Sequence, residues 1–136
     1  MLYETIIYEA KDGVATITLN RPDAANALND TMAGDLLDAL QQAGTDPSIR
    51  ALLITAAGKA FCAGQDLKAV PGTRSIAELL ATTWNPIVRG IRELLPALDA
   101  VAALCLGGNP AAAAALGGPF TGDRVVDASD TLSGLR

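Results

Sequence analysis

Two short runs of β-forming residues open the chain. Residues 3–8 and 14–19 are rich in β-branched and aromatic side chains, and the second run alternates apolar with polar residues, as a half-buried strand does. The polar link between them, residues 9–13, ends in Asp-Gly, a dipeptide typical of tight hairpin turns. The pattern predicts a β-hairpin whose second strand buries Ala15, Ile17 and Leu19.

A helical period follows. Apolar residues recur every three or four positions, so one face of a helix would carry Met32, Leu36, Ala39, Leu40 and Ala43. Asn29 or Asp30 can cap the start of this helix, and Gly44 is expected to end it. Residues 50–56 form a continuous apolar run, the type of strand that is buried on both faces of a parallel sheet. Strand, helix and strand in this order predict a crossover unit.

The second half of the chain continues the alternation of helices and strands. Residues 75–95 favour a helix that is interrupted at Pro86, whose ring would kink or restart it. The remaining expectations are a strand at 101–106, a turn at 107–110, a helix at 111–116 and a strand at 123–128. No internal repeat or linker divides the chain. We therefore expect one α/β domain over residues 1–136.

Composition and charge exclude several classes of protein. Half of the 136 residues are hydrophobic and 18% are charged, which excludes a disordered or fibrous chain. The net charge of −5 is spread out and forms no basic stripe, so we expect no nucleic-acid partner. Polar residues interrupt the apolar run at 97–120, and the N-terminus does not resemble a secretory signal. We expect a cytoplasmic protein without a membrane span.

The chain contains no histidine, which excludes Ser-His-Asp, Cys-His and His-ligated metal chemistry. Its two cysteines, Cys62 and Cys105, form neither a disulfide framework nor a CxxC pair, so no metal site is expected. Cys62 has no base near it in sequence and fits a packed small residue better than a nucleophile.

The most informative stretch joins the strand at 51–56 to a turn at 61–67. Ala63 and Gly64 are small, so a ligand can approach the backbone closely there. If a helix starts just beyond, its free N–H groups would point toward that ligand. Backbone N–H groups suit acyl-thioester chemistry, because a thioester oxygen gains negative charge as it becomes an enolate or a tetrahedral adduct. An ordinary strand-to-helix turn would have the same short sequence.

Several motifs in the right order and separation carry a family resemblance. They are YETIIYEAKDGVATITLNRPDAANALN, then IRALLITAAGKAFCAGQDL, and then WNPIVR. In these motifs the chain resembles the N-terminal half of the crotonase (enoyl-CoA hydratase/isomerase) superfamily. The details are most similar to ring-epoxide isomerases of phenylacetyl-CoA breakdown, with generic enoyl-CoA hydratases nearly as similar.

The resemblance implies a fold of repeated ββα units and an acyl-CoA site. The oxyanion hole would be formed by the backbone amides of Gln65 and Ala114, and no cofactor is implied besides the CoA of the substrate. The CoA arm would lie along Ala25, Asn26, Ala27, Ala63, Gly64, Asp66 and Leu67. Asn26 could instead cap a turn, and Asp66 could instead cap a following helix.

The chain also departs from the family pattern. A lysine that often meets CoA phosphates is replaced by Ala24, and the possible substitutes are Arg21, Lys59 and Lys68. Ala113 and Ala115 flank Ala114 where the family usually has glycine, and Gly117 occupies the position of the hydratase carboxylate. Family members are about twice as long, and the missing part contains a second catalytic acid and the helices of trimerisation. Asp127 and Asp130, the acids near the end, fit turn or surface positions.

The sequence thus predicts an incomplete crotonase-like domain that binds an acyl-CoA and stabilises its enolate for isomerisation or hydration. One alternative is a truncated, catalytically inactive fragment that binds CoA or another subunit. Another is an α/β relic that binds nothing. Exposed apolar surface would make the chain a homo-oligomer or otherwise self-associating.

Overall fold

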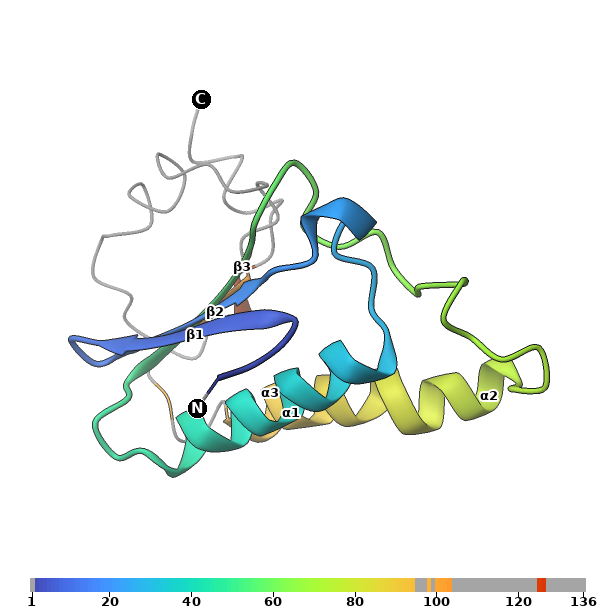
Figure 1. Ribbon diagram of the computed structural model, residues 1–136. Coiled ribbons are helices and arrows are strands. Elements are labelled where there is room, and N and C mark those ends of the chain that lie inside the picture. Colours follow the sequence, from blue (N-terminus) through green and yellow to red (C-terminus); the bar gives the residue numbers. More distant parts are fainter. Residues whose placement is uncertain (1, 95–97, 99, 104–124, 127–136) are drawn as a thin grey trace.

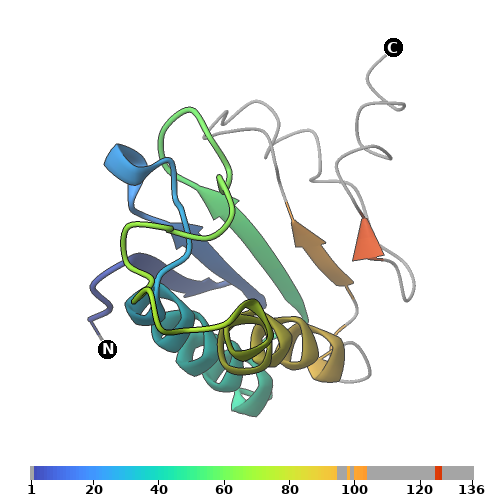
Figure 2. The ribbon, with the colours of Figure 1, turned by 90° about the vertical axis from the view of Figure 1, so that its right-hand side faces the viewer.

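The computed structural model describes residues 2–94, 98, 100–103 and 125–126. Within these residues, a sheet has the strand order β1 (Ile6–Lys11), β2 (Val14–Leu19), β3 (Ala51–Ala56), β4 (Ala100–Ala103) and β5 (Val125–Val126). β1 and β2 are antiparallel, and all later neighbours are parallel. Helices α1 (Asp30–Thr45) and α3 (Asn85–Leu94) lie side by side over one face of the sheet (Figures 1 and 2). The α/β class and the parallel crossover from β2 through α1 to β3 are confirmed.

The predicted hairpin is present, but its first strand is displaced. Asp12 and Gly13 both have positive φ, 51° and 82°, as a two-residue type I′ turn requires, so the strand continues to Lys11. Residues 3–5 are not part of the strand. Instead, the backbone N–H and the hydroxyl of Thr5 donate to the Asp35 carboxylate of α1, at 2.8 and 2.7 Å. These contacts to α1 hold the start of the chain against the helix.

Helix α1 buries the face that its periodicity predicts. Met32, Leu36, Ala39, Leu40 and Ala43 are buried together with Ala33. Asn29 is the N-cap, and its side chain accepts a hydrogen bond from the Met32 N–H at 2.9 Å. The prediction that Gly44 ends the helix is wrong, because α1 continues to Thr45. A Cβ atom on Gly44 would lie 2.5 Å from a methyl carbon of Leu94, so this glycine allows α1 and α3 to pack closely.

Strand β3 is present and parallel to its neighbours, as predicted, but it is not buried equally on both faces. Leu52, Ile54 and Ala56 are buried on the side of the helices, whereas the alternate residues are half-buried. β2 repeats this alternation, and Ile17 is fully buried. The hydrophobic core therefore lies between one face of the sheet and the α1–α3 pair.

The helical stretch after residue 75 is divided into three parts. A capping box of Ser75 and Glu78 starts α2 (Ile76–Leu79), a π-helical turn η2 (Leu80–Trp84) follows, and α3 begins at Asn85. The predicted interruption lies earlier than expected: the wide turn ends at Trp84 and α3 begins at Asn85, so Pro86 falls in the first turn of α3, where a residue without an N–H is tolerated. No helix in the described part of the chain is long and apolar enough to cross a membrane.

The last predicted elements are described only in part. Three of the four residues of β4 and both residues of β5 fall within the strands expected at 101–106 and 123–128, and Ala100 lies one residue before the first of them. The turn expected at 107–110 and the helix expected at 111–116 lie outside the described residues.

Candidate functional site

Two loops meet beyond the carboxyl ends of β2 and β3, the edge where ligands bind in open α/β sheets. After β2, a short 3-10 helix η1 (Pro22–Ala24) leads to Ala25 and Asn26, which have positive φ of 50° and 54°. After β3, the chain forms the turn at residues 61–67. Figure 2 shows these two loops at the same end of the sheet.

The two loops pair like strands. The Ala63 N–H donates to the Ala25 carbonyl at 3.0 Å, the Leu28 N–H donates to the Gly64 carbonyl at 2.7 Å, and the Asp66 N–H donates to the Leu28 carbonyl at 2.9 Å. The structure thus brings together the predicted site residues of both motifs. No helix starts directly after this turn, since the next one, α2, begins at Ile76.

Asn26 joins the loops from the inside. Its side chain is fully buried, accepts a hydrogen bond from the Arg21 N–H and donates to the carbonyls of Ala57 and Ala60, each at 2.8 Å. All of these contacts belong to the framework of the site. A contact of Asn26 with CoA stays a prediction, and the residue's clear role here is to fix one loop on the other.

Leu28 fixes the direction of the Gly64–Gln65 peptide. The chain has no cis peptide among its described residues, so the carbonyl of Gly64 and the N–H of Gln65 point in opposite directions. Since the carbonyl points at the Leu28 N–H, the Gln65 N–H points away from the 21–28 loop. This N–H makes no hydrogen bond to any part of the chain that the structure describes.

Gly64 is required for its backbone conformation. Its φ of +103° is one that residues with a side chain rarely adopt. A Cβ atom built there would meet nothing within 4 Å in the part of the chain that the structure describes. Among the described residues, the space beside the Gly64 Cα is therefore open.

Arg21 and Asp66 form an ion pair that sequence reasoning missed. A guanidinium nitrogen of Arg21 lies 2.9 Å from Asp66 Oδ2, and the same side chain also donates to the Ala27 carbonyl. The hydrogen bond from Arg21 lowers the pKa of Asp66 below its usual value. Asp66 caps no helix but accepts from the Lys68 N–H at 3.2 Å within its own turn. Arg21 is thus already paired, whereas Lys59 and Lys68 are exposed.

The Gln65 side chain has two partners. Its Oε1 accepts a hydrogen bond from the indole N–H of Trp84 at 2.8 Å, and its Nε2 donates to the Leu28 carbonyl at 3.0 Å. Trp84 was not expected at the site, because 19 positions separate it from Gln65 and no local pattern predicts the contact.

The other expected residues take simpler positions. Ala63 and Leu67 are exposed, Ala25 is half-buried and Ala27 is buried. Cys62 is half-buried and packs against the core, in agreement with its interpretation as a packing residue. Ala114, the second expected oxyanion amide, lies outside the described residues, as do Ala113, Ala115, Gly117, Asp127 and Asp130.

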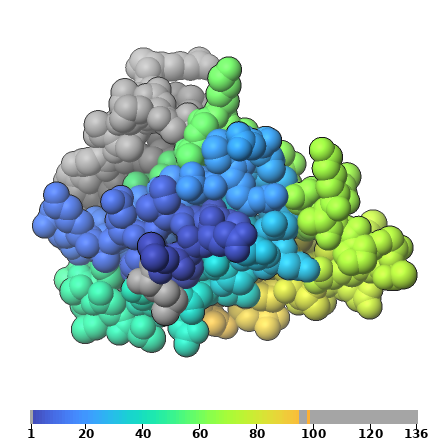
Figure 3. Space-filling model, in the orientation of Figure 1, coloured from blue at the N-terminus to red at the C-terminus, as the bar shows by residue number. Residues whose placement is uncertain are grey.

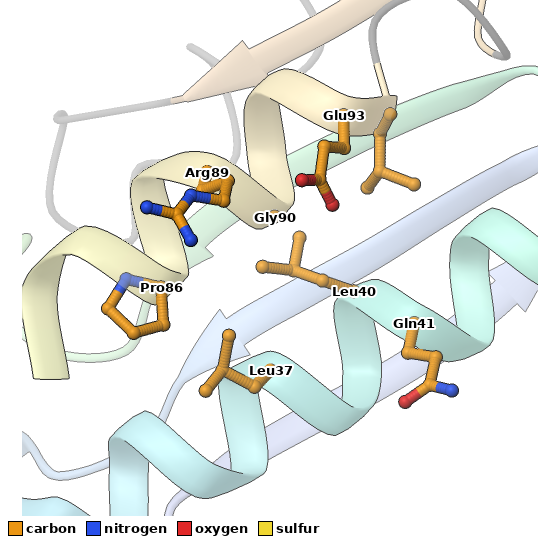
Figure 4. A pocket seen from close by; sticks show the side chains of 8 residues that line it. Leu37, Leu40, Gln41, Pro86, Arg89, Gly90 and Glu93 are labelled. Carbon is orange, nitrogen blue, oxygen red and sulfur yellow. The ribbon is translucent and has the colours of Figure 1, made fainter. Parts of the chain in front are cut away.

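A separate cavity of about 380 Å³ lies between α1 and α3 (Figure 4). It is lined by Leu37, Leu40, Gln41, Pro86, Arg89, Gly90, Glu93 and Leu94. None of the predicted site residues lines it. The cavity is a groove between two packed helices and is distinct from the loops that carry the candidate site.

Comparison with known proteins relates this geometry to a family. Residues 9–116 match the family model described as enoyl-CoA hydratase/isomerase. A 1,2-epoxyphenylacetyl-CoA isomerase of Escherichia coli (strain K12) is 40% identical over 123 residues, which are 86% of this chain and 46% of that protein. An (E)-benzylidenesuccinyl-CoA hydratase of Thauera aromatica is 34% identical over 106 residues, which are 76% of this chain and 41% of that protein.

The fold agrees with the sequence match. The crystal structure of an enoyl-CoA hydratase from Mycobacterium avium subsp. paratuberculosis K-10 superposes with a TM-score of 0.62 at 29% identity, covering 76% of this chain and 37% of that chain. The chain spans less than half the length of the relatives it matches, and the match lies in their N-terminal portion. The expected resemblance, including that to the ring-epoxide isomerases, is confirmed. The chain belongs to the enoyl-CoA hydratase/isomerase family of the crotonase superfamily.

Proposed function

We propose that this chain binds an acyl-CoA thioester at the 63–67 turn, and that the Gln65 N–H donates a hydrogen bond to the thioester oxygen. The observation that carries the proposal is the fixed Gly64–Gln65 peptide, whose carbonyl is bound by Leu28 and whose N–H points away from that loop. The names of the two curated relatives describe reactions of acyl-CoA compounds.

A preorganised N–H contributes most when the bound oxygen gains charge. An enolate oxygen is more negative than the ground-state carbonyl, so the hydrogen bond strengthens as the reaction proceeds. One such donor typically contributes about 3–4 kcal/mol to the stabilisation of a transition state. The second donor in this proposal is the Ala114 N–H.

The CoA arm, in the same proposal, follows the paired loops. Ala25 and Leu67 offer apolar contact, whereas Ala27 is buried, and the ion pair of Arg21 with Asp66 keeps this edge close to neutral. Lys59 and Lys68 are the exposed cations of the second loop and are suitable partners for CoA phosphates. Because Ala24 replaces the lysine that is usual in the family, the affinity should be nearer the millimolar end, a binding free energy of about −4 kcal/mol.

A second candidate function is acyl-CoA binding without turnover. Moving a proton on carbon needs a positioned acid or base. Asp66 is the carboxyl group next to the Gln65 amide, but Arg21 pairs with it and lowers its pKa, which makes it a weak base. Within the described residues, this favours binding and polarisation of the thioester without hydration or isomerisation of the acyl group.

Calorimetric titration with acetyl-CoA and with S-ethyl-CoA tests the proposal, because the second ligand keeps the CoA but has no thioester oxygen. If the Gln65 N–H makes a net favourable hydrogen bond to the thioester oxygen, acetyl-CoA should bind about 2- to 10-fold more tightly than S-ethyl-CoA. Gly64→Ala should abolish this preference, because alanine disfavours the φ of +103°. Gly72→Ala is the matched control, since Gly72 also has open space around it but no positive φ.

Two outcomes would contradict the proposal. One is equal affinity for the two ligands in the unmodified chain. The other is a preference that survives in Gly64→Ala while the variant's backbone amide signals at residues 63–66 have clearly moved.

A further inference from the structure

The orientation of the Gln65 side chain is unambiguous. An indole N–H can only donate, so the atom that faces Trp84 must be the side-chain oxygen. A backbone carbonyl can only accept, so the atom that faces Leu28 must be the side-chain nitrogen. Both contacts require the same amide orientation, and neither could be kept if the group were flipped.

One of these hydrogen bonds goes to Leu28, the residue that also holds the Gly64–Gln65 peptide. The Leu28 carbonyl accepts from the Gln65 side chain and also from the Asp66 N–H, while the Leu28 N–H holds the Gly64 carbonyl. Leu28 is therefore bonded to the residues before and after Gln65 and to Gln65 itself. Its backbone is also shielded, because the Leu28 side chain is buried in the core.

Trp84 brings a second element to this loop. It is the last residue of the π-helical turn η2, in which the Asn85 N–H bonds back five residues to the Leu80 carbonyl. One extra residue in a helical turn rotates the segments on its two sides by about 100° relative to each other. The indole is half-buried and packs against the core, so its N–H is held in place rather than free to follow Gln65.

We propose that Trp84 and the Gln65 side chain act as positioning residues that hold the Gly64–Gln65 peptide with its N–H toward the thioester oxygen. This inference rests on the function proposed above and adds two side chains to it. Neither side chain contacts the reacting atoms. The indole N–H orients the Gln65 amide group, and that amide group adds a hydrogen bond to the backbone of Leu28, which in turn holds the peptide.

A role in positioning differs from a role in stability. If Trp84 only filled space in the core, its replacement would weaken the fold and lower the affinity for every CoA ligand alike. If it positions the Gln65 N–H, its replacement should lower the affinity for a ligand with a thioester oxygen and leave the affinity for S-ethyl-CoA unchanged.

The test uses the full chain and two variants. Trp84→Phe keeps an aromatic ring in the core but removes the indole N–H, and Gln65→Met keeps the backbone N–H and the side-chain length but removes both side-chain hydrogen bonds. Each should reduce the preference for acetyl-CoA over S-ethyl-CoA by about 2- to 10-fold, the effect of one net hydrogen bond. Val88→Ala is the control, because Val88 is 60% exposed and lies one helical turn after Trp84.

The outcomes separate this inference from the proposed function. The positioning role is supported if the unmodified chain prefers acetyl-CoA over S-ethyl-CoA and this preference falls in Trp84→Phe and Gln65→Met but not in Val88→Ala. If folded Gln65→Met keeps the full preference, the positioning role is wrong and the proposed function is unaffected. If the unmodified chain binds the two ligands equally well, both the proposed function and the positioning role are wrong. If Trp84→Phe does not fold, Gln65→Met alone decides.

Discussion

The guanidinium of Arg21 lies 2.9 Å from the carboxylate of Asp66, so the loop after β2 and the loop after β3 are joined by an ion pair. The two side chains are only 22% and 14% exposed, which reduces screening by water. Together with Asn26, the pair makes one unit of two loops that are far apart in the sequence. The geometry of the Gln65 amide depends on this unit.

The ion pair predicts a pH dependence of stability. Arg21 lowers the pKa of folded Asp66 below the value of about 3.9 for an unfolded aspartate. The ion pair therefore contributes fully to the stability of the fold at pH values above the unfolded pKa, and this contribution is lost as the pH falls through the folded pKa. The melting temperatures of the unmodified chain and of Asp66→Asn should differ at neutral pH and converge in acid. A difference that stays constant with pH, or that appears equally in the exposed control Asp23→Asn, would contradict this.

Asn26→Ala should cost much of the stability of the loops. It removes three hydrogen bonds and leaves the Arg21 N–H and the carbonyls of Ala57 and Ala60 without their partner. We expect a loss of about 2–4 kcal/mol in the free energy of unfolding, measured by urea denaturation. Asn20→Ala, at an exposed position, should change it by less than about 0.5 kcal/mol. Equal effects of the two substitutions would disprove the framework role of Asn26.

Two glycines of α1 predict opposite effects of the same substitution. Gly34 has nothing within 4 Å of a built Cβ, so Gly34→Ala should stabilise the helix by about 0.5–1 kcal/mol. Gly44→Ala places a carbon 2.5 Å from the buried Leu94 side chain and should cost about 1 kcal/mol through overpacking. Urea denaturation of both variants measures the difference. If Gly44→Ala were as stable as Gly34→Ala, the close packing of α1 on α3 would be wrong.

Local patterns predicted the elements whose own residues determine them. The Asp12-Gly13 turn, the capped helix α1 and the central strand β3 all follow from short-range periodicity and turn chemistry. The extent of β1 did not follow, because Asp35 of α1 competes for the backbone of Thr5. The end of α1 did not follow either, because Gly44 is placed by its contact with α3 and not by helix termination.

In the candidate site too, local sequence predicted some features, whereas others depend on contacts between distant residues. The two loops could be identified from their motifs, and small residues at the turn indicated where a ligand can approach. The contacts that orient the site are pairings over long sequence distances, such as Trp84 with Gln65 and Arg21 with Asp66. No periodicity in a single sequence reports such pairs. They become visible only when the fold brings the side chains together.

Exposed apolar side chains predict self-association. Leu67 is 79% exposed, Ile76 of α2 is 76% exposed and Val88 of α3 is 60% exposed. Figure 3 shows the segment through α2 projecting from one side of the molecule. Because water disfavours such surfaces, sedimentation should find a species larger than one chain. Replacing Ile76 and Val88 by serine should shift it toward the monomer, whereas Thr73→Ser, at an exposed polar position, should not. A monomer at high concentration would contradict this prediction.

The backbone amide signal of Gln65 in ¹H–¹⁵N NMR spectra tests the central claim most directly, because it reports on the proposed donor itself. Saturation with acetyl-CoA should move the Gln65 amide proton downfield, as expected when a free N–H gains a carbonyl acceptor, and S-ethyl-CoA should move it much less. A Gln65 signal that stays in place while acetyl-CoA saturates the chain would show that this N–H does not bind the thioester oxygen.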